Sequence, residues 1–418
     1  MKGIGLLVAS VAVIGMSACR DRQGQLQQDR TTVRDSAGTA IVVNRASAEM
    51  TDWRLAPTPE RVIGDPEAHP VAQLFRAYSA TRTGTGDIVI GNSGTSQILV
   101  VTKDGSLLAA FGRRGRGPGE FGGMARVIAS DADAILIEDL GLQRKLLRFT
   151  LTGELVEEVV LPTRVIFRGG AWSDPAASPA GVEFILAEPL DAPNLGRVTR
   201  PQRGPLFVVR FTYHGDGPDT LATYPGTELF NADVGPQPAF GGGTASGPRS
   251  VAPLFGSKTR LAGGGTPWRA VVADQARASY DVFGEDGSLV RRVQWQATGR
   301  VPTSRDITLA REEFVRSRRQ DPAGARRSLN VMPPVEETPV LDQLMVGRDN
   351  RVWVRAYALP TDAAAQWWVF SEEGVLIATL NIPREAQVLE IGDDYVLTRM
   401  MDDLDVERIE LWPIQRGN

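Results

Sequence analysis

The apolar residues of this chain fall in short runs that alternate with polar turn residues, as the segment 100–139 shows most clearly. Two runs rich in Val, Leu, Ala and Phe flank a Lys-Asp-Gly turn at 103–105. A glycine-rich stretch at 112–119 follows, and after a second polar turn a new apolar run begins at Ala134. Short apolar runs bounded by Gly, Asp and Lys are typical of β-strands, so this segment predicts a hairpin, a crossover and a further strand.

The same pattern recurs around five glycines with similar apolar residues before and after them. These glycines are Gly105, Gly153, Gly217, Gly287 and Gly374. In each unit an apolar or aromatic residue stands four positions earlier, and in most units another stands six positions earlier. A leucine follows two positions later in four of the five units. Even offsets place side chains on one face of a strand, because side chains alternate with a period of two.

An additional apolar run lies upstream of four of these hairpins, at 87–90, 134–137, 268–272 and 351–354. Units of roughly 40–50 residues with about four strands each are typical of the blades of a β-propeller. The tail 390–414 holds two strand patterns but no hairpin glycine. We therefore expect six blades, the last completed by the N-terminal residues Thr32 to Val43. The segments 169–205 and 224–267 are rich in Gly, Pro, Ala and Ser and predict long surface loops around strands such as 181–186.

The sequence FGRRGRGPGEF at 111–121, with the turn and the strand that ends at Glu138-Asp139, resembles the NHL-repeat-like and TolB-like six-bladed β-propellers. The opening TVRDSAG at 32–38, followed by Ile41 to Val43, is similar to the start of the bacterial extracytoplasmic propeller lipoproteins. The resemblance implies an all-β, six-bladed β-propeller. It also implies an aspartate near the end of an inner strand, a place that Asp139 and Asp274 fit.

One helix interrupts this all-β pattern, so the predicted fold is a six-bladed β-propeller with one short helical insertion. The segment 304–320 has Ser304 as a candidate N-cap, an early Asp306 and arginines gathered near its end. Because it falls between the fourth and fifth units, we expect it to lie across one face of the propeller.

The N-terminus predicts a lipoprotein signal peptide over residues 1–18. Lys2 precedes an apolar run that is short for a membrane-spanning helix, and small residues stand just before Cys19. This arrangement resembles a bacterial lipobox, which implies that Cys19 is acylated. Residues 19–30 are polar and predict a flexible tether, and residues 31–418 the propeller domain. We therefore expect an extracytoplasmic protein held by its lipid in the inner or the outer membrane.

Composition and motifs limit the chemistry. Forty-four glycines and 27 prolines suit a fold with many turns, and the formal charge of −4 gives no reason to expect nucleic acid as a partner. The motifs HExxH, CxxC, GK[ST] and GxSxG are absent, and the histidines are limited to His69 and His214. A histidine-based catalytic zinc site is therefore not expected, and no cofactor is predicted. Glu138 and Asp139 are candidates either for a cation near the channel or for caps of the strand end, and the sequence leaves the metal question open.

The glycine-rich stretch 112–119 has a structural and a functional interpretation. Glycines with positive φ, among them Gly117, would permit a tight crossover between blades. The three arginines Arg113, Arg114 and Arg116 are not explained by the repeat, and we predict them as a cationic rim for a carboxylate, phosphate or anionic sugar. Trp353, Trp367, Trp368 and Tyr357 are candidates for an aromatic binding surface, although the repeat register favours packing between blades for Trp368.

Taken together, the patterns favour a binding or scaffold module for a protein, peptide or glycan over an enzyme. The alternative is a cation-dependent hydrolase or lyase similar to the lactonase and strictosidine-synthase-like propellers. The two interpretations differ in the central channel, where four or more converging Asp, Glu, Asn or His side chains would favour the enzyme. Fold alone decides neither of them.

Overall fold

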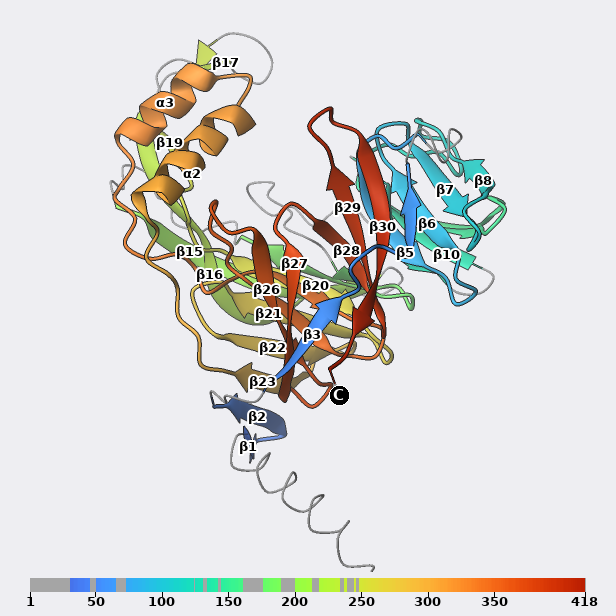
Figure 1. Cartoon of the computed structure of the whole chain (residues 1–418), viewed down its shortest axis with the longest axis horizontal. Coiled ribbons are helices and arrows are strands. Elements are labelled where there is room, and N and C mark those ends of the chain that lie inside the picture. The colour runs from blue at the N-terminus through green and yellow to red at the C-terminus, as the bar shows by residue number, and fades with distance from the viewer. Residues whose placement is uncertain are drawn as a thin grey trace, which may run out of the picture.

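The computed structural model describes twelve stretches of the chain, and every structural statement below concerns these residues. They are 31–45, 50–64, 73–123, 125–130, 134–141, 144–160, 176–188, 200–212, 218–233, 237–238, 244–245 and 248–417. Their strands pair mostly antiparallel, in sheets that are arranged as the blades of a propeller (Figure 1).

The first two blades each contain four strands in sequence order. The first holds β5 (Ala77–Arg82), β6 (Ile88–Asn92), β7 (Gln97–Val101) and β8 (Leu107–Phe111). The second holds β9 (Ala125–Ser130), β10 (Ala134–Asp139), β11 (Lys145–Thr150) and β12 (Leu155–Val160). Within each blade, neighbouring strands in the sequence pair with each other, so the contacts that build a blade are local.

The third and fourth blades carry additional strands. The third holds β13 (Ala176–Ala177), β14 (Val182–Ala187), β15 (Gln202–Thr212) and β16 (Asp219–Asp233), with β19 (Pro248–Val251) on the far part of β16. The short strands β17 (Gln237–Pro238) and β18 (Thr244–Ala245) pair with each other. The fourth holds β20 (Thr259–Gly264), β21 (Arg269–Asp274), β22 (Ser279–Gly284) and β23 (Leu289–Gln294). Much of the segment predicted as loop at 224–267 is therefore strand.

The last two blades take strands from both ends of the chain. The fifth holds β24 (Leu341–Val346), β25 (Val352–Ala356), β26 (Ala364–Phe370) and β27 (Leu376–Pro383), with β3 (Thr51–Leu55) parallel to β27. The sixth holds β28 (Gln387–Ile391), β29 (Tyr395–Met401) and β30 (Glu407–Gln415), and its fourth strand is β4 (Arg61–Ile63).

The predicted hairpin glycines occupy the turn between the third and fourth strands of a blade. Gly105, Gly153, Gly287 and Gly374 have φ between +83° and +91°, and each amide donates to the carbonyl three residues earlier. An L-residue with a side chain disfavours this left-handed conformation, which explains why glycine recurs at this place. Gly217 lies outside the described residues.

Hydrophobic side chains fill the space between neighbouring blades all the way around the ring. Six clusters of buried residues each join strands of two adjacent blades. The cluster between the last and the first blade contains Leu397 and Ile409 on one side and Ile88 and Ile90 on the other. The ring is therefore closed by packing as continuous as that between blades adjacent in the sequence.

The strand that completes the last blade differs from our prediction. Residues 32–43 form the hairpin of β1 (Thr31–Ser36) and β2 (Thr39–Asn44), and β2 runs parallel to β23 at the outer edge of the fourth blade. Instead, β4 pairs with β30 through Ile63 and Ile409. The prediction was wrong because hydrophobic alternation marks 32–43 as strand but does not say which sheet edge it joins, and β4 has only three residues.

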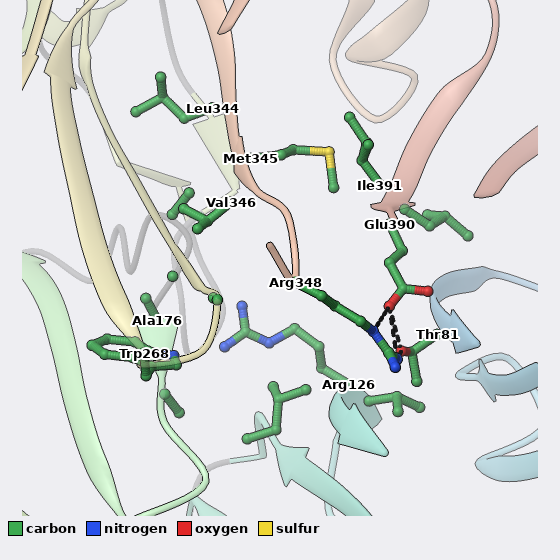
Figure 2. Close-up of a pocket in the computed structure, with 18 of the residues that line it drawn as sticks. Thr81, Arg126, Ala176, Trp268, Leu344, Met345, Val346, Arg348, Glu390 and Ile391 are labelled. Carbon is green, nitrogen blue, oxygen red and sulfur yellow. Dashed lines mark hydrogen bonds and ion pairs between the residues drawn. The ribbon is translucent and has the colours of Figure 1, made fainter. Parts of the chain in front are cut away.

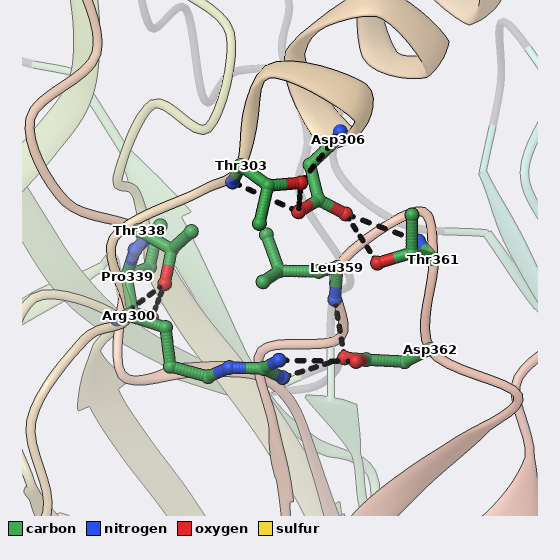
Figure 3. A network of polar contacts seen from close by, with 8 residues as sticks. All are labelled: Arg300, Thr303, Asp306, Thr338, Pro339, Leu359, Thr361 and Asp362. Carbon is green, nitrogen blue, oxygen red and sulfur yellow. Dashed lines mark hydrogen bonds and ion pairs between the residues drawn. The ribbon is translucent and has the colours of Figure 1, made fainter.

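The insertion between the fourth and fifth blades contains two helices, α2 (Ser304–Ser317) and α3 (Pro322–Asn330), whereas the sequence predicted one. Thr303, not Ser304, is the N-cap of α2 and shares a capping box with Asp306. Asp306 also accepts hydrogen bonds from the amide and hydroxyl of Thr361, at 3.1 and 2.6 Å (Figure 3). Burial alone would raise the pKa of Asp306, but the hydrogen bonds from Thr303 and Thr361 lower this pKa to about 2. An ionised Asp306 thus ties α2 to the loop between β25 and β26.

The predicted signal peptide, Cys19 and the tether at 19–30 lie outside the described residues. Among the residues that are described, the helices are too short and too polar to cross a membrane. Lipid attachment at Cys19 therefore stays a prediction.

Candidate functional site

A cavity of about 390 Å³ lies where the innermost strands of all six blades meet (Figure 2). Each of these strands contributes to its wall, in blade order through Ala80, Arg126, Ala177, Gly263, Met345 and Glu390. In a propeller the inner strands surround a central channel, so this cavity is part of that channel. Every blade therefore positions part of the same site.

On one side of the cavity, Glu390 of β28 is held by several donors. Its carboxylate accepts hydrogen bonds from the hydroxyl of Thr81 at 2.8 Å, the amide of Arg82 at 2.7 Å and the hydroxyl of Tyr395 at 3.0 Å. Burial, and after it the nearby Glu390 carboxylate, raises the pKa of Tyr395, so this phenol remains a donor. Glu390 is thus held in a fixed orientation by groups from two blades.

Arg348 extends into the cavity from the turn between β24 and β25 and pairs with Glu390 (Figure 2). Its Nε lies 3.1 Å from Glu390 Oε1, and its Nη2 donates to Thr81 Oγ1 at 3.0 Å and to the carbonyl of Arg82. The side chain keeps 41% of its surface exposed, against 15% for Glu390. The guanidinium of Arg348 is therefore held by hydrogen bonds on one side, and the side chain is open to solvent on the other.

Arg126 of β9 supplies a second guanidinium to the cavity (Figure 2). Its Nε lies 3.0 Å from the buried carboxylate of Glu138 on β10. Glu138 also pairs with Arg144, which in turn pairs with Glu183 of β14. Alternating charges thus run from the cavity into the interface between the second and third blades, and they hold Arg126 in place as Glu390 holds Arg348.

The remaining wall is built from small and apolar side chains, among them Ala176, Trp268 and Val346 (Figure 2). Glycine is required at two places on β20. A Cβ atom at Gly263 would stand 2.5 Å from the Trp268 ring, and one at Gly264 would stand 2.7 Å from the carbonyl oxygen of Val346. The close approach of these strands leaves a cavity with two cationic groups on an otherwise largely uncharged wall.

The predicted arginines lie on the connection between β8 and β9. Arg113, Arg114 and Arg116 are exposed, and none of them lines the channel cavity. Arg113 pairs with Glu120 at 2.7 Å, and Glu120 also accepts from the amide of Gly117 at 2.8 Å. The structure thus brings the three arginines together on a surface crossover, where their role in binding anions stays a prediction.

One detail of this crossover differs from our expectation. Positive φ is found at Gly112 and Gly119, with values of +90° and +70°, and not at Gly117. Asp139 accepts hydrogen bonds from the amides of Gly122, Gly123 and Gly141. Asp139 therefore caps the end of its strand, which is one of the two roles expected for it from the sequence.

No group of three or more His, Cys, Asp or Glu side chains in the described part of the chain is placed to hold a metal ion. His69 and His214 are outside that part. Trp353 and Trp367 are buried between blades, and Trp368 packs on Trp295 with ring centroids 5.5 Å apart. Tyr357 borders a cavity beneath α2.

Sequence reasoning missed Arg126, Arg348 and Glu390. The repeat was anchored on the hairpin glycine, which marks the outer half of each blade. The repeat did not include the innermost strands, so the polar residues on or next to them did not stand out. Counting back from each hairpin to the first strand of its unit would have found Arg126 as a charged residue within an apolar inner strand.

Comparison with known proteins agrees with this architecture. Residues 74–168 match the family model DUF5128, which is described as a 6-bladed beta-propeller. The chain has a six-bladed β-propeller fold. No curated protein matches the sequence.

Several solved structures resemble this propeller at low identity. A putative exported protein from Bacteroides fragilis is 13% identical with a TM-score of 0.46, covering 90% of this chain and 100% of its own. A member of the duf4221 family from Bacteroides vulgatus is 11% identical with a TM-score of 0.48, covering 88% and 100%. A calcium-binding regucalcin from Agrobacterium tumefaciens is 11% identical with a TM-score of 0.39, covering 88% and 98%. At these values the similarities say nothing about activity.

Proposed function

We propose that this protein is a lipid-anchored, extracytoplasmic binding module whose propeller channel accepts an acidic group of a protein, peptide or glycan. The observation that carries the proposal is the pair Arg126 and Arg348, which extend from different blades into one cavity (Figure 2). Guanidinium groups are the usual partners of carboxylate, phosphate and sulfate groups, because their planar N–H donors match these anions.

The ion pairs of the two arginines support this role. Glu390 and Glu138 fix the orientation of the guanidinium groups, so a ligand does not have to order them on binding. The half-exposed face of Arg348 is where a ligand would make contact.

The alternative of a cation-dependent hydrolase or lyase has no specific observation in its favour. Calcium takes six to eight oxygen ligands. Among the described residues that line the cavity, Glu390 is the one Asp, Glu, Asn or His, and it is already paired with Arg348. The alternative is therefore retained as an outcome of the test below.

The binding experiment compares the wild-type chain with Arg348→Gln. The change is expected to preserve the fold, because Glu390 keeps its bonds from Thr81, Arg82 and Tyr395. Arg408→Gln is the matched control, since Arg408 is similarly exposed and also pairs with one acid, Asp402. Each variant is immobilised and exposed to detergent-solubilised cell envelope, and the captured molecules are identified by mass spectrometry.

We expect the wild type and Arg408→Gln to capture the same molecule and Arg348→Gln to lose it. Equal capture by Arg348→Gln would contradict the channel as the binding site. Calcium-dependent hydrolysis of a lactone or ester by the wild type, abolished by a chelator, would favour the enzyme instead.

The proposed anchor is tested separately. Cys19 is the only cysteine and stands directly after an apolar run that ends in small residues. Cys19→Ser should move the protein from the membrane to the soluble fraction, and wild type should carry acyl chains by mass spectrometry. Wild type without acyl chains, together with membrane-bound Cys19→Ser, would contradict lipid attachment.

A further inference from the structure

The outer strands of the fourth and fifth blades are each covered by a further strand from the N-terminal part of the chain. β2 runs parallel to β23, and β3 runs parallel to β27. Both covered strands carry a bulge just after the hairpin turn. The added strand begins opposite the first residue after that bulge, Arg291 in β23 and Ala378 in β27. The fold therefore adds a parallel strand to a blade at one defined register.

The outer strand of the first blade, β8, has the same bulge, but no strand pairs with its other edge in the described part of the chain. That edge lies at the rim of the blade (Figure 1). The three residues that β3 covers on β27 are buried. The residues at the same places in β8, 109–111, are exposed or half-buried, and Leu108 at the bulge keeps 47% of its surface exposed. β8 is thus built like a covered strand and lacks the cover.

The edge of β8 also lacks the residues by which proteins usually protect a free strand edge. Charged side chains and proline are common devices for this purpose, and Leu107–Phe111 contains neither. β12 of the second blade is likewise without an added strand among the described residues, but it carries Glu157 and Glu158. The bulge of β8 does not prevent addition, since β23 and β27 have it too. A free and uncharged edge is a template for a strand of another chain.

The crossover that follows β8 places positive charge at the end of this edge. Arg114 and Arg116 are exposed and form no ion pair with the described residues. The acids close to them already have partners, because Glu120 pairs with Arg113 and Glu158 pairs with a lysine of β11. Two guanidinium groups are therefore left to face solvent directly after the uncharged strand.

Backbone hydrogen bonds hold the crossover in a fixed shape. The amide of the buried Phe121 donates to the carbonyl of Arg113 at 2.9 Å, and the amide of Gly115 donates to the carbonyl of Phe121 at 3.0 Å. Arg114 lies between these bonds. Its backbone is therefore ordered before a partner arrives, which reduces the entropy that binding costs.

We propose that the free edge of β8 binds an extended segment of another protein, which adds to the first blade as a parallel strand and ends in acidic residues. The parallel direction is the one that β2 and β3 take on equivalent strands. A segment parallel to β8 runs toward the crossover, so its C-terminal end lies beside Arg114 and Arg116. Backbone hydrogen bonds along the edge supply affinity, and carboxylates at the end of the segment match the guanidinium groups.

This site is separate from the channel, because neither β8 nor the crossover lines the channel cavity. The proposal therefore does not depend on the function proposed for the channel. It also gives a role to two of the three arginines that the repeat does not explain.

The test measures the binding of synthetic peptides to the purified full chain by fluorescence anisotropy. The probe is the peptide TVTVTGEEE, with both ends blocked, which should bind at concentrations up to about 1 mM. The control EEEGTVTVT has the same composition with the acids at the opposite end, and GGGGGGEEE keeps the acids without the strand. Each control should bind about tenfold more weakly than the probe, because it loses either the arginines or the strand pairing.

The protein variants locate the site. Arg114→Gln combined with Arg116→Gln should weaken the probe about tenfold at low salt, where screening is least, and leave the uncharged peptide TVTVTGQQQ unchanged. The matched control is Arg305→Gln combined with Arg326→Gln, since these arginines of the helical insertion are also exposed and the change in net charge is the same. The control should change the affinity by less than about twofold. Melting curves verify that both double variants are folded.

Three results would overturn the proposal. They are no binding of TVTVTGEEE to the wild type, equal binding of either control peptide, and full affinity in the variant of Arg114 and Arg116. The oligomeric state, measured by light scattering, tests the other occupant of the edge. A wild-type dimer that Ala110→Lys converts to a monomer would assign the edge to a second copy of this chain and would also overturn the proposal.

Discussion

Two glutamates of the last blade contact opposite ends of β5, the first strand of the first blade. Glu407 of β30 accepts hydrogen bonds from the amides of Arg76 and Ala77, both at 2.9 Å, where the strand begins. Glu390 of β28 accepts from Thr81 and Arg82, where the strand ends. Each carboxylate also pairs with one arginine, Arg399 or Arg348. Together they fasten the last blade to the first.

The two glutamates differ in what lies beside them. Glu407 and Arg399 keep only 6% and 13% of their side-chain surfaces exposed, whereas Arg348 opens into the channel cavity with 41%. Both glutamates combine a backbone amide and a guanidinium to join the last blade to the first. At Glu407 this is the whole role that we see, whereas at Glu390 the arginine also borders the candidate site. The two ion pairs thus differ in their access to a cavity and not in the type of interaction.

The largest expected effect comes from the strand on which the closure depends. Ile63 of β4 is fully buried between the last and the first blade, so Ile63→Asp would place a charge in that core. We expect a loss of about 4 kcal/mol or more of unfolding free energy, or failure to fold. Val33→Asp on β1 is the control, since Val33 is 63% exposed at the edge of the fourth blade. Equal melting temperatures of the two variants would contradict the role of β4.

The next effect comes from Glu407 itself. Glu407→Gln removes the charge opposite the nearly buried Arg399 and one of the acceptors for the amides of Arg76 and Ala77. Leaving these groups without a full partner should lower the unfolding free energy by about 2–3 kcal/mol, measured by thermal denaturation. Glu385→Gln at an exposed position is the control and should have little effect. A loss as small as that of Glu385→Gln would mean that Glu407 does not fasten the first blade.

The contribution of Glu407 should depend on pH in a defined direction. Burial opposes its ionisation, but the hydrogen bonds from Arg399 and from the amides of Ala77 and Arg76 outweigh burial and lower its pKa. Since the folded pKa lies below the unfolded value of about 4.3, the stabilisation is complete above that value and is lost as the pH falls through the folded pKa. The difference in melting temperature between wild type and Glu407→Gln should therefore be constant near neutral pH and shrink below about pH 4. A difference that grows on acidification would contradict this assignment.

A smaller effect is expected at the channel. Glu390→Gln keeps one of the two acceptor oxygens, which can still accept from Arg82 and Tyr395, and Arg348 on the open side can turn toward water. We expect a loss of about 1–2 kcal/mol, less than for Glu407→Gln, together with an altered affinity for any anionic ligand of the channel. A stability loss larger than that of Glu407→Gln would reverse the comparison and make Glu390 the main closure contact.

The sequence predicted the elements that repeat and missed those that depend on long-range contacts. The glycines Gly105, Gly153, Gly287 and Gly374 identified the blades. Each stands at the same place in its unit, because the turn there needs a positive φ. The sequence does not indicate the partner of β4, because a strand of three residues is too short for its hydrophobic pattern to show which sheet it joins. The channel site was missed for the same reason, because Glu390 meets Thr81 and Arg82 only when the last blade packs against the first.

The smallest effect on stability is expected for the arginines that the sequence singled out. Arg113, Arg114 and Arg116 are exposed on the crossover, and the bond from the Gly117 amide to Glu120 does not involve their side chains. Changing all three to Ala should therefore shift the melting temperature by no more than about 2 °C, as substitutions at exposed positions usually do. The matched structural change is Gly112→Val, at a position where φ is +90° and a Cβ atom would stand 2.4 Å from the Phe121 ring, and it should destabilise the fold strongly. If the triple variant also weakens the capture of an anionic molecule, more so at low salt where screening is least, then the crossover contributes to binding alongside the channel. Unchanged capture at every salt concentration would restrict the binding role to Arg126 and Arg348, and a triple variant as unstable as Gly112→Val would mean that the arginines are structural.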